Sequence, residues 1–181
     1  TGITDEAAAL TAYTKGTTGA GTNTLVSDGE WSVAASTLDT ALTGKVRLTG
    51  DLTVTGITTE SAASTTYSTT NTGASTVMLS ATDGTWSIAT GDLDTDLGNS
   101  IKYSGALTVT DIASSDEAAA LTMYTTAKTG ATTNTLTATD NNWSVTKGNL
   151  DTALAANVRF AGDLAVSSIT AEKAAIYSYT T

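Results

Sequence analysis

Two periods of apolar residues alternate along the chain. In segments such as DLTVTGI (51–57) every second residue is apolar, which is typical of a strand with one buried face. In segments such as TDEAAALTAYTK (4–15), Ala, Leu and Tyr recur at helical spacing, acidic residues fill the first turn, and Thr4 can cap the helix. The corresponding segment TESAASTTYSTTNTG (59–73) has poorer helix formers. The pattern therefore predicts strands alternating with short helices.

The alternation repeats as a unit of about 55 residues. The stretch WSVAASTLDTAL (31–42) returns as WSIATGDLDTDL (86–97) and as WSVTKGNLDTAL (143–154). We divide the chain into units 1–55, 56–110 and 111–167, followed by the opening of a fourth unit at 168–181. The residues that mark equivalent positions in the units are Trp31, Trp86 and Trp143; Asp39, Asp94 and Asp151; and Tyr13, Tyr67, Tyr124 and Tyr179.

Each unit contains two strand–helix passes of about 27 residues, which is the coil length of an α/β solenoid. We therefore predict one repeat array of the α/β class, a solenoid of parallel strands and short helices with two coils in each unit. An all-β solenoid or sandwich-like repeats are the alternative, since Thr favours strands. Stacking explains the repetition, because each unit covers the apolar face of its neighbour. The marker residues then form a structural ladder, with Trp near Trp and Leu on Leu.

The recurring Trp residues have two interpretations. Buried, they belong to the core ladder, which the apolar context of each Trp-Ser segment favours. Exposed, they would form an aromatic platform for sugars. Gly19, Gly73 and Gly130 are expected to end helices, and Gly50, Gly105 and Gly162 are expected at corners or bulges of strands.

The recurring charged residues predict local structure first. Asp39, Asp94 and Asp151 are expected in the first turn of a helix, with Ser36 and Asp39 at capping-box spacing. Arg47 and Arg159 each precede an Asp by four residues, which suggests surface ion pairs with Asp51 and Asp163. Asp28, Asp83 and Asp140 are expected in turns; a calcium ladder is the alternative, although each loop offers few oxygen ligands.

Composition narrows the classes of function. The 181 residues include no Cys, His or Pro, so thiolate sites, disulfides and the usual general base are absent from the sequence. The formal net charge of −10 opposes binding to nucleic acid, and no apolar run is long enough to insert into a membrane. The distinctive residues come in threes rather than as one asymmetric cluster. We therefore expect no catalytic residues, no cofactor except a possible calcium ion, and no enzyme activity.

The segments GDLTVTGITTESA and TNTGAS, SGALTVTDIASSDEAAAL, and the Asp-Leu-Asp helix before each Gly resemble the Thr/Ala-rich repeat arrays of large bacterial extracellular surface proteins. These are adhesins, surface-layer proteins and fibre-forming proteins. A second likeness is to insert segments of flagellin and hook-associated proteins. The first resemblance implies an extracellular or cell-surface location and a structural role, with no functional residue carried over.

Three functions follow as expectations. The first is a subunit of a filament or surface layer that assembles through open-ended, head-to-tail stacking. The second is a spacer or ligand-binding module of a large adhesin, and the third is a phage fibre or flagellar outer domain. The expected partners are copies of the chain itself or neighbouring repeats of a longer chain. If residues 168–181 complete the first coil of the next copy, their deletion should abolish assembly.

Overall fold

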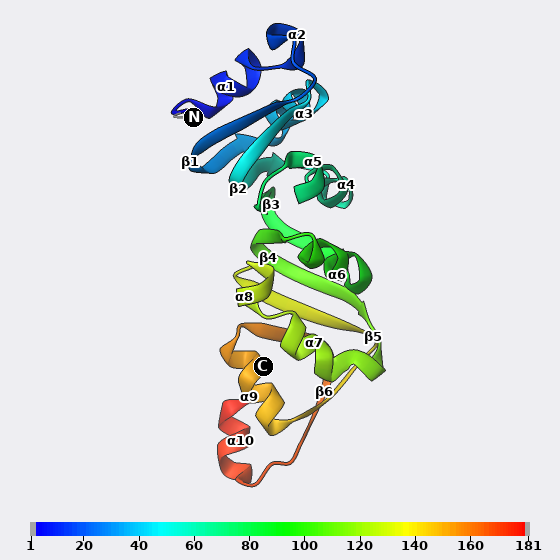
Figure 1. Cartoon of the computed structure of the whole chain (residues 1–181). Helices are drawn as coiled ribbons and strands as arrows, with labels where there is room; N and C mark the ends of the chain where they lie inside the picture. The colour runs from blue at the N-terminus through cyan, green and yellow to red at the C-terminus, as the bar shows by residue number, and fades with distance from the viewer. Residues whose placement is uncertain (1–2, 180–181) are drawn as a thin grey trace.

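The computed structural model describes residues 3–179 and contains parallel strands joined by short helices (Figure 1). The strands are β1 (Asn23–Ala34), β2 (Val46–Ile57), β3 (Thr76–Ala89), β4 (Ile101–Ile112), β5 (Thr133–Thr146) and β6 (Val158–Ser167). The helices before each odd-numbered strand are α1 (Glu6–Ala12) and α2 (Lys15–Thr18), α4 (Glu60–Thr66) and α5 (Thr69–Thr72), and α7 (Glu117–Met123) and α8 (Thr126–Thr129), the last pair preceded by the 3-10 turn η1 (Ser114–Asp116). The others are α3 (Ala35–Thr43), α6 (Thr90–Gly98), α9 (Lys147–Ala155) and α10 (Glu172–Ser178).

The strands lie in sequence order in one parallel sheet, from β1 to β6. Connections between neighbouring parallel strands are right-handed, so this order puts the connecting helices on one face of the sheet. The burial pattern agrees, because in each half of β2 and β4 buried residues alternate with partly or fully exposed ones, and the alternation is interrupted at the central Gly and near the end of the strand. The predicted α/β class and parallel strands are confirmed, and the all-β alternative is wrong. The sheet curls into a half-barrel, with β1 and β6 at its two ends (Figure 1).

The curl follows from a stagger between units. Within the first unit, β1 pairs with β2 along both of its halves. Between units, only the second half of β2 pairs with the first half of β3, and β4 pairs with β5 in the same way. Each unit is therefore displaced along the strands by half a strand, and a staggered parallel sheet curls as it does in a barrel.

This stagger overturns the expectation that Trp lies near Trp. Trp31 is in register with Leu52, and the same row continues through Val77 to Ile101. Trp86 begins a separate row, half a strand away, that runs through Leu107 and Asn134 to Val158. Leu, not Trp, is therefore the neighbour of each Trp.

The predicted Asp-Gly turns are bulges inside single strands. Between Val26 and Glu30, β1 carries three residues where β2 has only Gly50. Gly50 has φ +104°, and a Cβ atom there would lie 2.2 Å from the carbonyl oxygen of Gly29. Side chains are therefore excluded at Gly50 and, through the same close approach of the opposite bulge, at Gly105 and Gly162. The bulge expected at these glycines therefore lies in the strand opposite each of them, and the glycines are where the partner strand makes room for it.

The Ala-rich segments form helices in all three units, including the poorer helix former at α4. Asp5, not Thr4, caps α1, because its carboxylate accepts from the Ala8 N–H at 3.1 Å. These helices are followed directly by Tyr13, Tyr67 and Tyr124, and the left-handed glycines at 19, 73 and 130 instead end the short second helices α2, α5 and α8. The predicted capping box is wrong, because α3 begins at Ala35 and Ser36 lies inside it. None of the helices described within 3–179 has the length and apolar character of a membrane span.

Candidate interface at the unit junctions

The three Trp residues lie in the core. Their side chains are 1%, 2% and 1% exposed at Trp31, Trp86 and Trp143. Each indole N–H donates to a backbone carbonyl of the next strand, at Thr49 (3.0 Å), Ser104 (3.1 Å) and Ala161 (3.0 Å). A buried indole satisfied in this way leaves no ring face for a sugar, so the aromatic platform is not formed.

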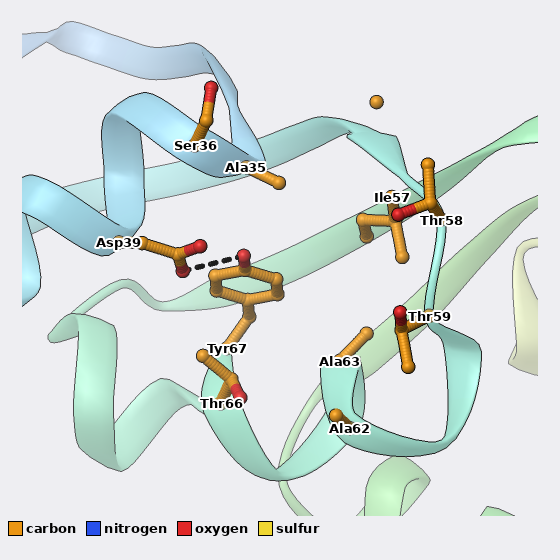
Figure 2. A pocket seen from close by; sticks show the side chains of 11 residues that line it. Ala35, Ser36, Asp39, Ile57, Thr58, Thr59, Ala62, Ala63, Thr66 and Tyr67 are labelled. Carbon is orange, nitrogen blue, oxygen red and sulfur yellow. Dashed lines mark hydrogen bonds between the residues drawn. The ribbon is translucent and has the colours of Figure 1, made fainter.

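A Tyr–Asp hydrogen bond ties each unit to the one before it. The Tyr67 hydroxyl donates to Asp39 Oδ1 at 2.7 Å, and Figure 2 shows the ring reaching from the end of α4 towards α3. Tyr124 donates to Asp94 at 2.7 Å, and Tyr179 donates to Asp151 at 2.5 Å. The structure therefore brings together two sets of marker residues that the sequence had only put at matching intervals.

The sequence predicts these three aspartates in the first turn of a helix, but in the structure they lie beyond it. Each is the fifth residue of its helix, in α3, α6 and α9, and receives the tyrosine hydroxyl from the side. Burial, followed by the bond to Asp39, raises the pKa of Tyr67 well above its usual value. Burial is also the largest cause that raises the pKa of Tyr124 to about 12. The pKa of the exposed Asp151 is lowered, first by Lys147, whose Nζ lies 2.6 Å away, and then by Tyr179.

A second tie, also a hydrogen bond, runs from the first helix of each unit forward to the first strand of the same unit. The carboxylate oxygen Oε2 of Glu6 accepts from the Ser32 N–H at 2.7 Å. Glu60 and Glu117 do the same for Ser87 (3.1 Å) and Ser144 (3.0 Å). Because of the stagger, the second half of β3 and of β5 has no preceding strand beside it, and the Glu satisfies an N–H on that open edge.

Sequence reasoning missed these glutamates as a set. It assigned the acidic residues only to the helix dipole. Their recurrence could have identified them, because the unit interval separates Glu6, Glu60, Glu117 and Glu172.

Backbone contacts complete each junction. The N–H of Ser75 donates to the Gly50 carbonyl at 2.8 Å, and that of Thr132 donates to the Gly105 carbonyl at 2.7 Å. Gly73 lies against the preceding unit, where a Cβ would be 3.1 Å from the Leu48 carbonyl oxygen. Gly130 packs in the same way, since a Cβ there would be 3.0 Å from Lys102 Cβ. Helix, loop and strand therefore all contact the unit before them.

The two ends of the described chain carry the unmatched halves of this junction. At the β1 end, Tyr13 is 48% exposed, and a Cβ on Gly19 would meet nothing within 4 Å. At the β6 end, Leu164 is 39% exposed, whereas the equivalent Leu52 and Leu107 are each 1% exposed. Leu164 lines a groove of about 540 Å³ whose other lining residues include Leu154, Arg159, Phe160, Gly162 and Tyr179.

The second unit contains one buried polar cluster. The Tyr103 hydroxyl donates to Asp96 Oδ2, and both side chains are buried. Burial raises the pKa of Asp96, and hydrogen bonds from Tyr103 and Ser64 oppose that rise. The cluster consists of Ser64, Asp96 and Tyr103. At the equivalent positions the other units carry apolar residues, namely Leu10, Ala41 and Leu48 in the first unit and Leu121, Ala153 and Phe160 in the third. The cluster is a local replacement of apolar packing, since its acidic group is already satisfied by its neighbours.

The remaining charged residues form no predicted site. Among the described residues, no three His, Cys, Asp or Glu side chains come close enough to hold a metal ion. Asp83 and Asp140 accept the N–H two residues later, at 3.0 Å each, which is turn chemistry; the side chain of Asp28 lies outside the described part.

The predicted Arg–Asp ion pairs are wrong. Arg47 donates to the backbone carbonyl of Val46 at 2.9 Å, and Arg159 donates to that of Val158 at 3.0 Å. Four residues along a strand span about 13 Å, too far for a contact between Arg47 and Asp51.

Comparison of the chain with protein-family models, with curated proteins and with solved structures found no match. Function is therefore inferred from the junction geometry.

Proposed function

We propose that the chain is an extracellular structural repeat protein of the solenoid type, whose copies stack head to tail into a filament or layer. The observation that carries this proposal is the complementarity of its two ends. The β6 end has the exposed surface that a following unit covers elsewhere in the chain. The β1 end has the exposed residues that contact a preceding unit elsewhere.

The internal junctions specify how a second copy would dock. In the β4–β5 pairing, Ala106 lies opposite Thr133, Leu107 opposite Asn134 and Val109 opposite Leu136. Copying this register to the ends pairs β6 with β1 of the second copy, with Asp163 opposite Thr22, Leu164 opposite Asn23 and Val166 opposite Leu25. Parallel strand addition would satisfy the open edges of both strands.

The side chains support the same docking. Gly19 of the added copy would lie against Arg159 and Phe160, as Gly73 lies against Arg47 and Leu48. Leu164 would be covered, as Leu107 is. A head-to-tail contact of this kind does not close on itself, so it propagates into a filament.

Composition supports a surface location. A chain without Cys, rich in Thr and with a net charge of −10 presents a polar surface that does not depend on disulfides. The spacer of a large adhesin remains the second function, since the same stacking would join repeats within a longer chain.

The test is sedimentation velocity and electron microscopy of the full chain at increasing concentration. Leu164→Glu puts a charge in the centre of the proposed interface. Met123→Glu is the matched control, because Met123 is 36% exposed but lies on α7 in the middle of the chain. We expect a ladder of oligomers or filaments from the full chain and from Met123→Glu, and loss of association in Leu164→Glu.

Two results would overturn the proposal. One is monomers at every concentration, both from the full chain and from a chain ending at Ser167, which keeps β6. The other is oligomers that form equally well in Leu164→Glu, because association would then use another surface. Rigid monomers would favour the spacer function instead.

A further inference from the structure

Each internal junction is bridged by one helix with two ties. The helix α4 reaches back through Tyr67 to Asp39 and forward through Glu60 to the Ser87 N–H. The helix α7 has the same pair of ties, through Tyr124 and Glu117. A complete junction therefore contains a single helix that belongs to both neighbouring units.

The terminal helices each make one half of this pair. The helix α1 has the forward tie, from Glu6 to Ser32, while its Tyr13 has no preceding unit in the described chain. The helix α10 has the backward tie, from Tyr179 to Asp151, and no described strand follows β6 for Glu172 to cap. Both helices carry the same Glu and Tyr at the same spacing, Glu6 with Tyr13 and Glu172 with Tyr179.

We propose that α10 occupies the binding surface on α9 and β6 that α1 of an added copy requires. When a copy is added, α10 therefore leaves this surface and α1 of the added copy takes its place, in an exchange of the two helices. This inference rests on the proposed head-to-tail stacking. The groove beside Leu164 is lined by Ser178, the last residue of α10, and by Tyr179 directly after it, which places α10 at the edge of the docking surface. One junction has room for one bridging helix, as α4 and α7 show.

The contacts favour α10 as the helix that leaves. The helix α1 buries Ala9 and Leu10 and packs against β1 and α3 of its own copy. It is also continuous through α2 with β1, as α4 is continuous through α5 with β3. The helix α10 buries Ala175, and its hydrogen bond from Tyr179 to Asp151 lies at the exposed surface. Deleting residues 168–181 should therefore promote assembly, the opposite of the effect expected from the sequence.

Matched Tyr→Phe substitutions test the exchange, since each removes one hydroxyl from an equivalent position. Tyr179→Phe removes only the hydrogen bond that holds α10 to Asp151 of α9. We therefore expect the concentration at half assembly to fall by about threefold. Tyr13→Phe removes the bond that α1 would make to Asp151 of the preceding copy, so we expect that concentration to rise by about threefold. Tyr67→Phe is the internal control and should leave it unchanged. Deletion of 168–181 should act like Tyr179→Phe, by about tenfold or more.

Hydrogen exchange gives a second readout in the full chain. On assembly, the amides of α10 should lose protection and those of α1 should gain it. Addition of Leu164→Glu to the deletion variant should abolish its assembly, which shows that association still uses β6.

The outcomes separate the two proposals. Assembly that weakens on deletion of 168–181 or in Tyr179→Phe overturns the exchange and leaves head-to-tail stacking standing, with α10 as the joining helix. Assembly in which α10 amides keep their protection also overturns the exchange alone. Absence of association in every variant, including the deletion, overturns the proposed function itself.

Discussion

The hydroxyl of Tyr67 donates a 2.7 Å hydrogen bond to Asp39 across the boundary between the first and second units. The donor is buried at the end of α4 and the acceptor is a carboxylate in the middle of α3. A hydrogen bond to a charged group contributes more than a neutral one, so Tyr67→Phe should lower the free energy of unfolding by about 1–2 kcal/mol. Urea denaturation measures this loss. Tyr13→Phe, which removes an exposed hydroxyl, should leave the stability of the monomer unchanged, and an equal loss in both variants would contradict the role of the bond.

The Asp96–Tyr103 pair predicts a non-additive result. Asp96→Ala alone leaves the buried Tyr103 hydroxyl without its acceptor, and Tyr103→Leu alone removes a hydrogen bond from the buried carboxylate. Each single change should cost about 2–3 kcal/mol. The double variant reproduces Ala41 and Leu48 of the first unit and should cost much less than the sum. A double-mutant cycle in urea measures the coupling; strictly additive costs would show that the pair does not act as a unit.

Much of the fold was predictable because it is local and repeated. The alternation of DLTVTGI and the helical spacing of DEAAAL determine which segments form strands and helices, and the repeat shows that neighbouring units stack. The stagger was not predictable, because the half-strand displacement depends on how the second half of β2 pairs with the first half of β3, a contact between two units.

The junction was predictable only as a list of equivalent positions. Tyr67 and Asp39 were both singled out by their intervals, but 28 residues separate them, and nothing in the sequence says that a hydroxyl meets a carboxylate there. Glu60 was overlooked because an acidic residue in a first helical turn already has a sufficient explanation in the helix dipole. Its second role depends on the open strand edge that the stagger creates.

Alkaline pH should loosen the junctions. Burial and the neighbouring Asp94 raise the pKa of Tyr124 from 10.0 in the unfolded chain to about 12 in the folded protein. The folded state then holds the proton more tightly, so this stabilisation is complete below pH 10 and is lost as the pH rises through about 12. Unfolding in urea at a series of pH values should show stability falling over this range. Tyr124→Phe should fall less steeply, and identical slopes would contradict the assignment.

A strained backbone position offers a stabilising change. Ser100, which follows α6, has φ +57°, a left-handed conformation that is costly for a residue with a Cβ. Ser100→Gly should raise the free energy of unfolding by about 0.5–1 kcal/mol. Ser104→Gly, in the interior of β4, is the control and should lower it by a similar amount, because glycine weakens a strand. Thermal unfolding of both variants checks the sign, and destabilisation by Ser100→Gly would contradict it.

The glutamate ties predict that an acceptor, not merely a side chain, is needed at Glu117. Its carboxylate is buried and accepts the Ser144 N–H at 3.0 Å on the strand edge that β4 leaves uncovered. Glu117→Ala should cost about 1–3 kcal/mol, because the N–H loses its partner and the edge of β5 is opened. Glu117→Gln keeps an oxygen acceptor of the same reach and should recover most of that loss. Urea denaturation gives the free energies, and hydrogen exchange at Ser144 reports the tie directly. Unchanged protection of that amide in Glu117→Ala would show that the edge is satisfied in another way.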